Sequence, residues 1–244
     1  MIQKNPITMV GTIARCWLFV YRTPAQEARR LLPPQLEPVV HGDWSFWNVV
    51  VCQVRNMRPK LSPLPIGFTY WHVAYRLYVR CRVHADEVIE GLYFLRSDCD
   101  SPLIAVAGNV VTDFNFHCGR VSVFCDNGHV HITVTAPGAD AYARINENKG
   151  PVLPAQSPFG SLDEASRFLK YKPNGISIDS AGRANVVHIV RDEQSWKSRL
   201  VCVEESRWSF FDDKDAALEI CYAVEPVFYQ WNRGCIQCHV CGDF

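Results

Sequence analysis

His117 and Asp113 are the side chains of this chain best suited to acid–base chemistry. An imidazole titrates near neutrality, so His117 can act as an acid, a base or a hydrogen-bond donor. Asp113 lies four residues earlier in a segment that we predict to be a strand, where alternate residues point to the same side. An Asp–His pair can orient the imidazole or share a proton, which predicts a catalytic role for both. Each also has a structural alternative, with His117 bonded to backbone before Gly119 and Asp113 capping a turn with Asn115.

Arg76 and Tyr93 are candidate substrate-binding residues. Arg76 lies in a run of large apolar residues, where a charged side chain is expensive to bury unless it has a partner. If it points inward, its guanidinium can bind a carboxylate through two hydrogen bonds. The alternative is a structural ion pair with Asp98 or Asp100. Tyr93 either lines the same cavity or packs in the core with its hydroxyl satisfied.

Two groups of residues have the spacing of metal ligands, but we expect no bound metal or cofactor. His129 and His131 share one strand face and could chelate zinc, yet the opposite face is the apolar one, which places both histidines outside. The segment from Cys235 to Cys241 has the Cys-x-x-Cys-His spacing of haem attachment and could also supply soft zinc ligands. We expect residues 235–244 to form a disordered, oxidisable tail, with a redox or metal-responsive role as an alternative.

The composition of the chain excludes several classes of protein. The 244 residues carry 25 basic and 25 acidic side chains, so no global field favours nucleic acid or an anionic membrane. No apolar run is long enough to span a bilayer, and no signal peptide is apparent at the N-terminus. We therefore expect a cytoplasmic protein with reduced thiols, despite its 11 cysteines.

The apolar patterns predict a mainly β (α+β) protein. Capping boxes at Thr23–Gln26 and Ser161–Glu164 each predict a short helix. The turn Asp126–Asn127–Gly128 predicts a hairpin, and residues 136–160 are expected to form a long excursion within one domain. The predicted strands lie near residues 10–21, 44–54, 68–82, 91–97, 103–112, 120–125, 129–135, 185–191, 200–205 and 218–229. Such a pattern favours one curved sheet or barrel with outer helices, formed by a single domain over residues 1–234.

Several blocks of sequence carry a resemblance to known proteins. The blocks are Tyr21–Pro24, Leu31–Pro38, Gly42–Trp44, Tyr75–Val79, Gly91–Leu95 and Ser209–Asp213. In this order and spacing they resemble the uncharacterised YqjF-like family, a branch of the acetoacetate decarboxylase-like superfamily. The resemblance runs from about residue 10 to about residue 232 and implies a mostly antiparallel β-barrel around a small-molecule cavity. It also makes a homo-oligomer possible.

The same resemblance implies that the lysine chemistry of the decarboxylases is lost. In those enzymes a lysine attacks the keto group of the substrate and forms a Schiff base, helped by a neighbouring lysine. The lysine pair falls here on Phe116 and His117, at the end of the segment that starts at Gly108. None of the lysines lies inside an apolar strand, where burial could lower its pKa, so each stays protonated at neutral pH.

Two further residues gain a role from the resemblance. A glutamate that handles substrate in the decarboxylases corresponds here to His72, with a register uncertain by two residues, and a carboxylate-binding arginine lies within one residue of Arg15. We therefore expect a pocket for a small organic molecule, lined by some of Arg15, His72, Arg76, Tyr93, Asp113 and His117. The protein either acts on a small carbonyl or carboxylate compound or binds it without catalysis.

Overall fold

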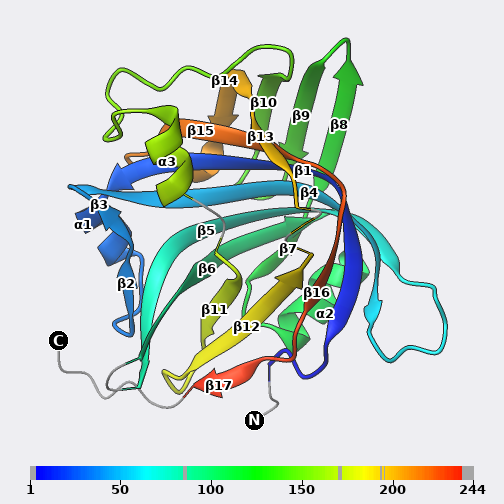
Figure 1. Ribbon diagram of the computed structural model, residues 1–244. Coiled ribbons are helices and arrows are strands. Elements are labelled where there is room, and N and C mark those ends of the chain that lie inside the picture. The colour runs from blue at the N-terminus through cyan, green and yellow to red at the C-terminus, as the bar shows by residue number, and fades with distance from the viewer. Residues whose placement is uncertain (1–3, 85–86, 170–171, 193, 195, 238–244) are drawn as a thin grey trace.

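The computed structural model describes residues 4–84, 87–169, 172–192, 194 and 196–237 (Figure 1). Long strands rich in valine and aromatic residues form most of it, with three short α-helices among the described residues. The strands are β1 (Met9–Pro24), β2 (Leu36–Pro38), β3 (Val40–His41), β4 (Trp44–Pro59), β5 (Phe68–His84), β6 (Glu87–Cys99), β7 (Phe116–Cys118), β8 (Arg120–Asp126), β9 (His129–Thr135), β10 (Ala141–Asn146), β11 (Asn174–Ile178), β12 (Ala184–Arg191), β13 (Ser198–Leu200), β14 (Cys202–Trp208), β15 (Ala217–Val224), β16 (Val227–Trp231) and β17 (Cys235–Gln237). The helices are α1 (Ala25–Arg30), α2 (Pro102–Val111) and α3 (Leu162–Phe168), with a 3₁₀ turn at Ser209–Phe211.

The larger sheet closes into a ring. Its pairings run from β1 through β16, β12, β11, β6, β5 and β4, and β4 pairs again with β1. Strand β1 is long enough to pair with β16 through its first half and with β15 through its second half. All neighbours in the ring are antiparallel except β11 and β6. The predicted mainly antiparallel, barrel-like architecture is thus confirmed.

A second sheet covers one side of the ring. It has four strands in the order β14-β10-β9-β8 and stands above β1 and β4 in Figure 1. The predicted hairpin between β8 and β9 is confirmed, because Asn127 and Gly128 both have positive φ angles, of 48° and 81°. Val130 and Ile132 are buried against the outer face of the ring. The segment 136–160, expected to be a long excursion within one domain, contains β10, which joins this sheet.

The predicted strand at residues 103–112 is wrong, because this segment is helix α2. Ser101 caps the helix by accepting a hydrogen bond from the Ile104 amide at 3.4 Å, and Pro102 occupies its first turn. The valine-rich sequence suggested a strand, but the Ser101 cap and Pro102 in the first turn favour a helix. Gly108 packs so closely on Phe116 that an added Cβ would lie 2.5 Å from the ring.

The two helices predicted from capping boxes both form, but only one has the expected cap. Ser161 accepts a hydrogen bond from the Glu164 amide at 3.1 Å and begins α3 as predicted. The cap predicted at Thr23 is wrong, because β1 continues through Pro24 and no side chain caps α1. The Thr23 hydroxyl donates instead to the Asp215 carbonyl at 2.7 Å. Long-range strand pairing therefore decides where α1 begins.

The predicted C-terminal tail is described only in part. Its first residues, Cys235–Gln237, form β17 and pair with β12, so the sheet extends beyond residue 234. Cys238, His239 and Cys241, on which the metal and redox alternatives depend, lie outside the described residues. In the described part of the chain, no helix is long and apolar enough to cross a membrane.

Candidate functional site

The inner face of the ring carries polar side chains among apolar ones. Successive residues of a strand point to opposite faces, and both faces of β4 and β5 are covered. The outward set packs against the second sheet, and the inward set contributes Asn48, His72 and Arg76. These three side chains are buried, with relative exposures of 2%, 8% and 5%. Burying a polar group costs free energy unless the group has a hydrogen-bond partner. We therefore take the space around these three side chains as the candidate site.

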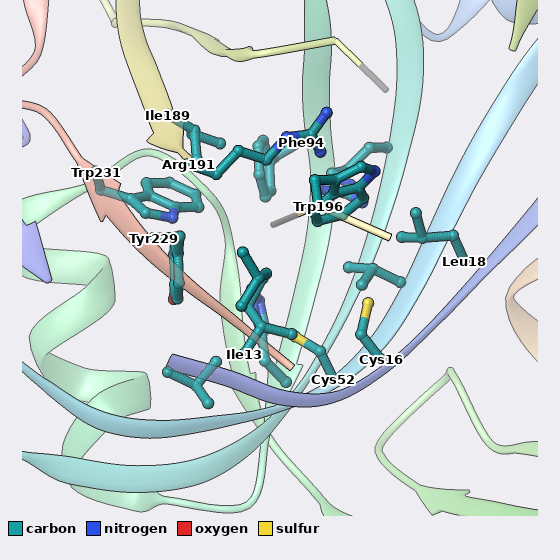
Figure 2. Close-up of a pocket in the computed structure, with 15 residues that line it drawn as sticks. Ile13, Cys16, Leu18, Cys52, Phe94, Ile189, Arg191, Trp196, Tyr229 and Trp231 are labelled. Carbon is teal, nitrogen blue, oxygen red and sulfur yellow. The ribbon is translucent and has the colours of Figure 1, made fainter. Parts of the chain in front are cut away.

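A central cavity of about 60 Å³ lies inside the ring. Figure 2 shows Cys16, Leu18 and Cys52, from β1 and β4, facing Ile189, Tyr229 and Trp231, from β12 and β16. His72 and Arg76 line the same space from β5. At roughly 10–15 Å³ per water molecule, the cavity has room for a few waters or a small organic group.

A larger cavity of about 280 Å³ adjoins the central one. It lies between the ring, helix α2 and the segment that leads into β1, and it is lined mostly by apolar side chains such as Tyr70, Phe114 and Phe116. His72, Tyr229 and Trp231 line both cavities and therefore form the boundary between them. Together the two spaces reach the lower end of the size range of small-molecule sites, about 300–1,000 Å³.

His72 is a buried, neutral imidazole at this boundary. Burial, the larger cause, and the nearby Arg76 guanidinium together lower its pKa to about 3. The ring stacks on Phe116 with centroids 5.4 Å apart. Its Nε2 atom is buried and has no hydrogen-bond partner among the described residues. A neutral imidazole presents one donor and one acceptor, so His72 can bond to a polar group placed in either cavity.

Arg76 is held in place by a chain of buried hydrogen bonds. Its guanidinium donates to the Asn48 side-chain oxygen, and its carbon Cζ lies 5.5 Å from the centre of the Phe94 ring. The Asn48 amide donates to the Tyr78 hydroxyl at 2.9 Å, which donates to the Leu169 carbonyl at 3.0 Å. This chain fixes the orientation of the guanidinium at the cavity wall.

The two carboxylates considered as ion-pair partners of Arg76 make other contacts. Asp98 is fully buried on the outer side of β6 and pairs with Arg96 at 2.7 Å. Asp100 accepts a hydrogen bond from the Trp71 amide at 2.8 Å.

His117 and Asp113 do not form the expected pair. The strand that was to align them is interrupted, because α2 ends at Val111 and Asp113 lies in the turn before β7. Asp113 contacts Lys4 at 3.3 Å, and His117 Nε2 lies 3.1 Å from the Asn115 side-chain oxygen. Partial burial lowers the pKa of His117. Neither residue lines the two cavities, and their catalytic role remains a prediction.

Arg15 and Tyr93 point away from the ring interior. Arg15 is exposed, with its Nη1 atom 3.7 Å from the Cys125 sulfur. Tyr93 packs on the outer face, where burial raises its pKa. Their neighbours Cys16 and Phe94 face the central cavity instead. Because a shift of one residue reverses the face of a strand, a register uncertain by one residue could not place the Arg15 side chain.

The family of the chain follows from a comparison with known families. The model of DUF2071, an uncharacterized conserved protein, matches residues 12–218. The chain belongs to the DUF2071 family. No curated protein matches the chain.

Solved structures show the fold of this DUF2071 protein. Acetoacetate decarboxylase from Legionella pneumophila gives a TM-score of 0.63 at 9% identity, covering 96% of this chain and 88% of that chain. An acetoacetate decarboxylase-like enzyme from Sphingomonas wittichii gives 0.60 at 11% identity, covering 95% and 92%. The enduracididine biosynthesis enzyme MppR complexed with pyruvate gives 0.55 at 14% identity, covering 98% and 92%. The predicted acetoacetate decarboxylase-like fold is therefore confirmed.

Sequence reasoning missed three polar or aromatic residues of the DUF2071 site. Asn48 is a lone amide in an apolar run, which is a signal that was available in the sequence. Arg191 and Trp196 line the central cavity, with the Arg191 guanidinium carbon 3.6 Å from the centre of the indole ring. They come from β12 and the segment after it, and only the closed ring brings them opposite β1 and β4.

Proposed function

We propose that this DUF2071 protein binds a small carboxylate or carbonyl compound inside the ring, with its polar group between His72 and Arg76. The observation that carries the proposal is that His72 lines two adjoining cavities and that its buried Nε2 atom has no hydrogen-bond partner among the described residues. A buried polar atom left without a partner costs about 1–3 kcal/mol. A ligand that supplies a hydrogen bond there recovers this cost.

The charge of the central cavity favours an anionic group. Two arginines line it, Arg76 and Arg191, and none of its described lining residues is an aspartate or glutamate. His72 adds no charge near neutral pH, since its pKa is about 3. A guanidinium binds a carboxylate through parallel hydrogen bonds, and the apolar walls accommodate the carbon skeleton of the ligand.

We further propose that the protein uses no lysine Schiff base. The described lining of both cavities contains no lysine. Phe116, which falls where the resemblance places a lysine of the decarboxylases, presents an aromatic ring to the larger cavity. Lys172 and Lys214 are paired with Glu90 and Asp213 elsewhere.

The chemical class of the ligand is supported by one of the structural neighbours. MppR was solved in complex with pyruvate, a molecule that carries both a carboxylate and a carbonyl. We propose the same class for this chain, and a reducing, cytoplasmic environment in which the described cysteines stay free.

A binding assay with matched ligands tests the proposal. Calorimetric titration with 2-oxo acids and simple carboxylic acids of increasing chain length is compared with the corresponding neutral amides. We expect acids to bind and amides to bind at least about tenfold more weakly, because the amides lack the charge that pairs with Arg76. Equal binding of acids and amides contradicts the proposed role of the arginines.

Two variants and one control locate the binding. Arg76→Gln and His72→Gln should each weaken acid binding at least about tenfold, whereas Arg15→Gln, on the outer face of the same ring, should leave it unchanged. Circular dichroism confirms that each variant is folded. Borohydride trapping with 2-oxo acids should leave every lysine unmodified, and a lysine adduct would show that the Schiff-base part of the proposal is wrong.

A further inference from the structure

Cys99 and Cys118 form a pair of directly opposed thiols on neighbouring strands. Cys99 ends β6 and Cys118 ends β7, and the two are Cα partners in the parallel pairing of these strands. Cys99 is fully buried, whereas Cys118 is exposed. Both are free thiols.

The backbone geometry of this pair suits a disulfide. Neighbouring strands lie about 4.7–4.9 Å apart. Disulfides join residues whose Cα atoms are about 4.4–6.8 Å apart. Directly opposed residues of β6 and β7 therefore have a Cα separation within the range that a disulfide spans. The two side chains also interact electrostatically, since Cys118 is one of the groups that raise the pKa of Cys99.

The surroundings give the two thiols different reactivities. Burial is the main cause that raises the pKa of Cys99 to about 11, so this thiol is protonated at neutral pH and donates to the Ser101 carbonyl at 3.3 Å. Cys118 is exposed on β7, which pairs only with β6 within the described part of the chain. Cys118 is thus the thiol that a dissolved oxidant reaches, and Cys99 is the buried thiol with which it would form a disulfide.

We propose that Cys99 and Cys118 are a site of reversible oxidation by hydroperoxides, with Cys118 reacting first and Cys99 completing a disulfide. The Cys118 thiolate attacks one oxygen of hydrogen peroxide, the O–O bond breaks, and Cys118 becomes a sulfenic acid while hydroxide leaves and takes a proton to form water. The Cys99 sulfur then attacks the Cys118 sulfur, the S–O bond breaks, and water leaves with the Cys99 proton. Two thiols are oxidised and one peroxide is reduced to two waters.

The bond would fix the strand that carries part of the cavity wall. Phe116 lies two residues before Cys118 on β7, stacks on His72 and lines the larger cavity. The disulfide would link the last residue of β7, Cys118, to Cys99 of β6. The oxidation itself does not depend on which ligand the cavity binds.

A second pair of opposed cysteines is a matched internal control. Cys16 and Cys52 are Cα partners in the antiparallel pairing of β1 and β4, so their backbone geometry also suits a disulfide. Both are buried, and burial raises the pKa of Cys52 to about 12 and that of Cys16 well above its ordinary value. With neither thiol exposed, this pair should stay reduced when Cys118 is oxidised.

The tryptic map of the chain separates the two pairs. Residues 97–120 contain no lysine or arginine before Arg120, so one peptide holds Cys99 and Cys118 and no other cysteine. Cys16 and Cys52 fall in separate peptides, each without a further cysteine. Folded protein is treated with hydrogen peroxide, alkylated, digested and analysed by mass spectrometry. We expect peptide 97–120 to lose two hydrogens and to resist alkylation. This oxidation should be at least about tenfold faster than the loss of free thiol at Cys16 and Cys52. Dithiothreitol should reverse the change.

Two variants test the order of the steps. In Cys99→Ser, Cys118 should be trapped as a sulfenic acid that reacts with dimedone, and in Cys118→Ser, Cys99 should remain open to alkylation after unfolding. Alkylation of both cysteines in the peroxide-treated wild type would overturn the proposal. Oxidation of Cys99 at the wild-type rate in Cys118→Ser, or equal oxidation of the Cys16 and Cys52 pair, would also overturn it.

Discussion

His72 should make the protein easier to unfold in mild acid. The folded chain keeps this imidazole neutral down to a pKa of about 3, because burial disfavours its charged form. An unfolded histidine has a pKa near 6.5. Between these values the unfolded chain binds a proton that the folded chain does not bind. The free energy of unfolding therefore falls as the pH drops below about 6.5, and this loss ends near pH 3.

The size of the effect follows from the two pKa values. At pH 5 the unfolded imidazole is almost fully protonated, while the folded one remains neutral. The linkage relation gives a loss of about 2 kcal/mol at pH 5 relative to pH 7.5. Replacing His72 with glutamine removes this titration and keeps a polar side chain. The difference in unfolding free energy between wild type and His72→Gln should therefore shift by about 2 kcal/mol between the two pH values.

Urea unfolding of both proteins at pH 7.5 and pH 5 measures this shift. Other acid-sensitive groups are present in both proteins and cancel in the comparison. Tyr70→Phe is a matched control, because Tyr70 lies on the same strand face, lines the larger cavity and has a pKa that burial raises far above this range. Its difference from wild type should be the same at both pH values. A His72→Gln difference that also stays constant would show that water or a charged partner already solvates the imidazole, and the reasoning about a buried neutral group would be wrong.

Three further substitutions test the supports of the fold, each by the midpoint of urea unfolding. Glu219→Gln should lower the free energy of unfolding by about 3–5 kcal/mol. It removes the carboxylate that lies 2.7 Å from the buried guanidinium of Arg22 in the wild type. The double variant with Arg22→Met should recover part of this loss. Gly128→Ala should cost about 1 kcal/mol or more, since the residue has a φ angle of 81° and an added Cβ would collide with the Asn148 side chain. Ser161→Ala should cost about 1 kcal/mol through loss of the α3 cap, and a change below about 0.3 kcal/mol would show that this cap contributes little.

The strands were predictable from sequence because tertiary packing and local pattern agree there. The hairpin at Asn127–Gly128 needs two positive φ angles, which these residue types accept readily. The strand prediction for the segment that forms helix α2 failed because two local signals disagree there. A run of valines favours a strand, whereas Ser101 followed by Pro102 marks a helix start, and the cap was the better guide. The predicted cap at Thr23, at the start of α1, was wrong for another reason. The pairing of β1 with β4 extends as far as Pro24.

The site was harder to predict than the fold because it depends on strand register. His72 and Arg76, each named as a candidate for the pocket lining, lie four residues apart on β5 and both line the central cavity, while their role in binding stays a prediction. Arg15 lies one position from an inward residue, and that single step moves it to the exterior. The positions of Arg191 and Trp196 depend on how distant strands close the ring, which no local pattern encodes.

The polar groups inside the ring are difficult to explain by stability alone. Asn48 and Arg76 are opposed on β4 and β5, and His72 lies four residues before Arg76 on the same inner face. Replacing buried charged groups by apolar residues of similar volume is often neutral or stabilising. A core selected only for stability would therefore fill this space with aliphatic side chains, as it does at Val50 and Val54 nearby. The chain instead keeps a cavity, an oriented guanidinium and an imidazole nitrogen without a hydrogen-bond partner among the described residues at one place, and the proposed polar ligand would account for all three together.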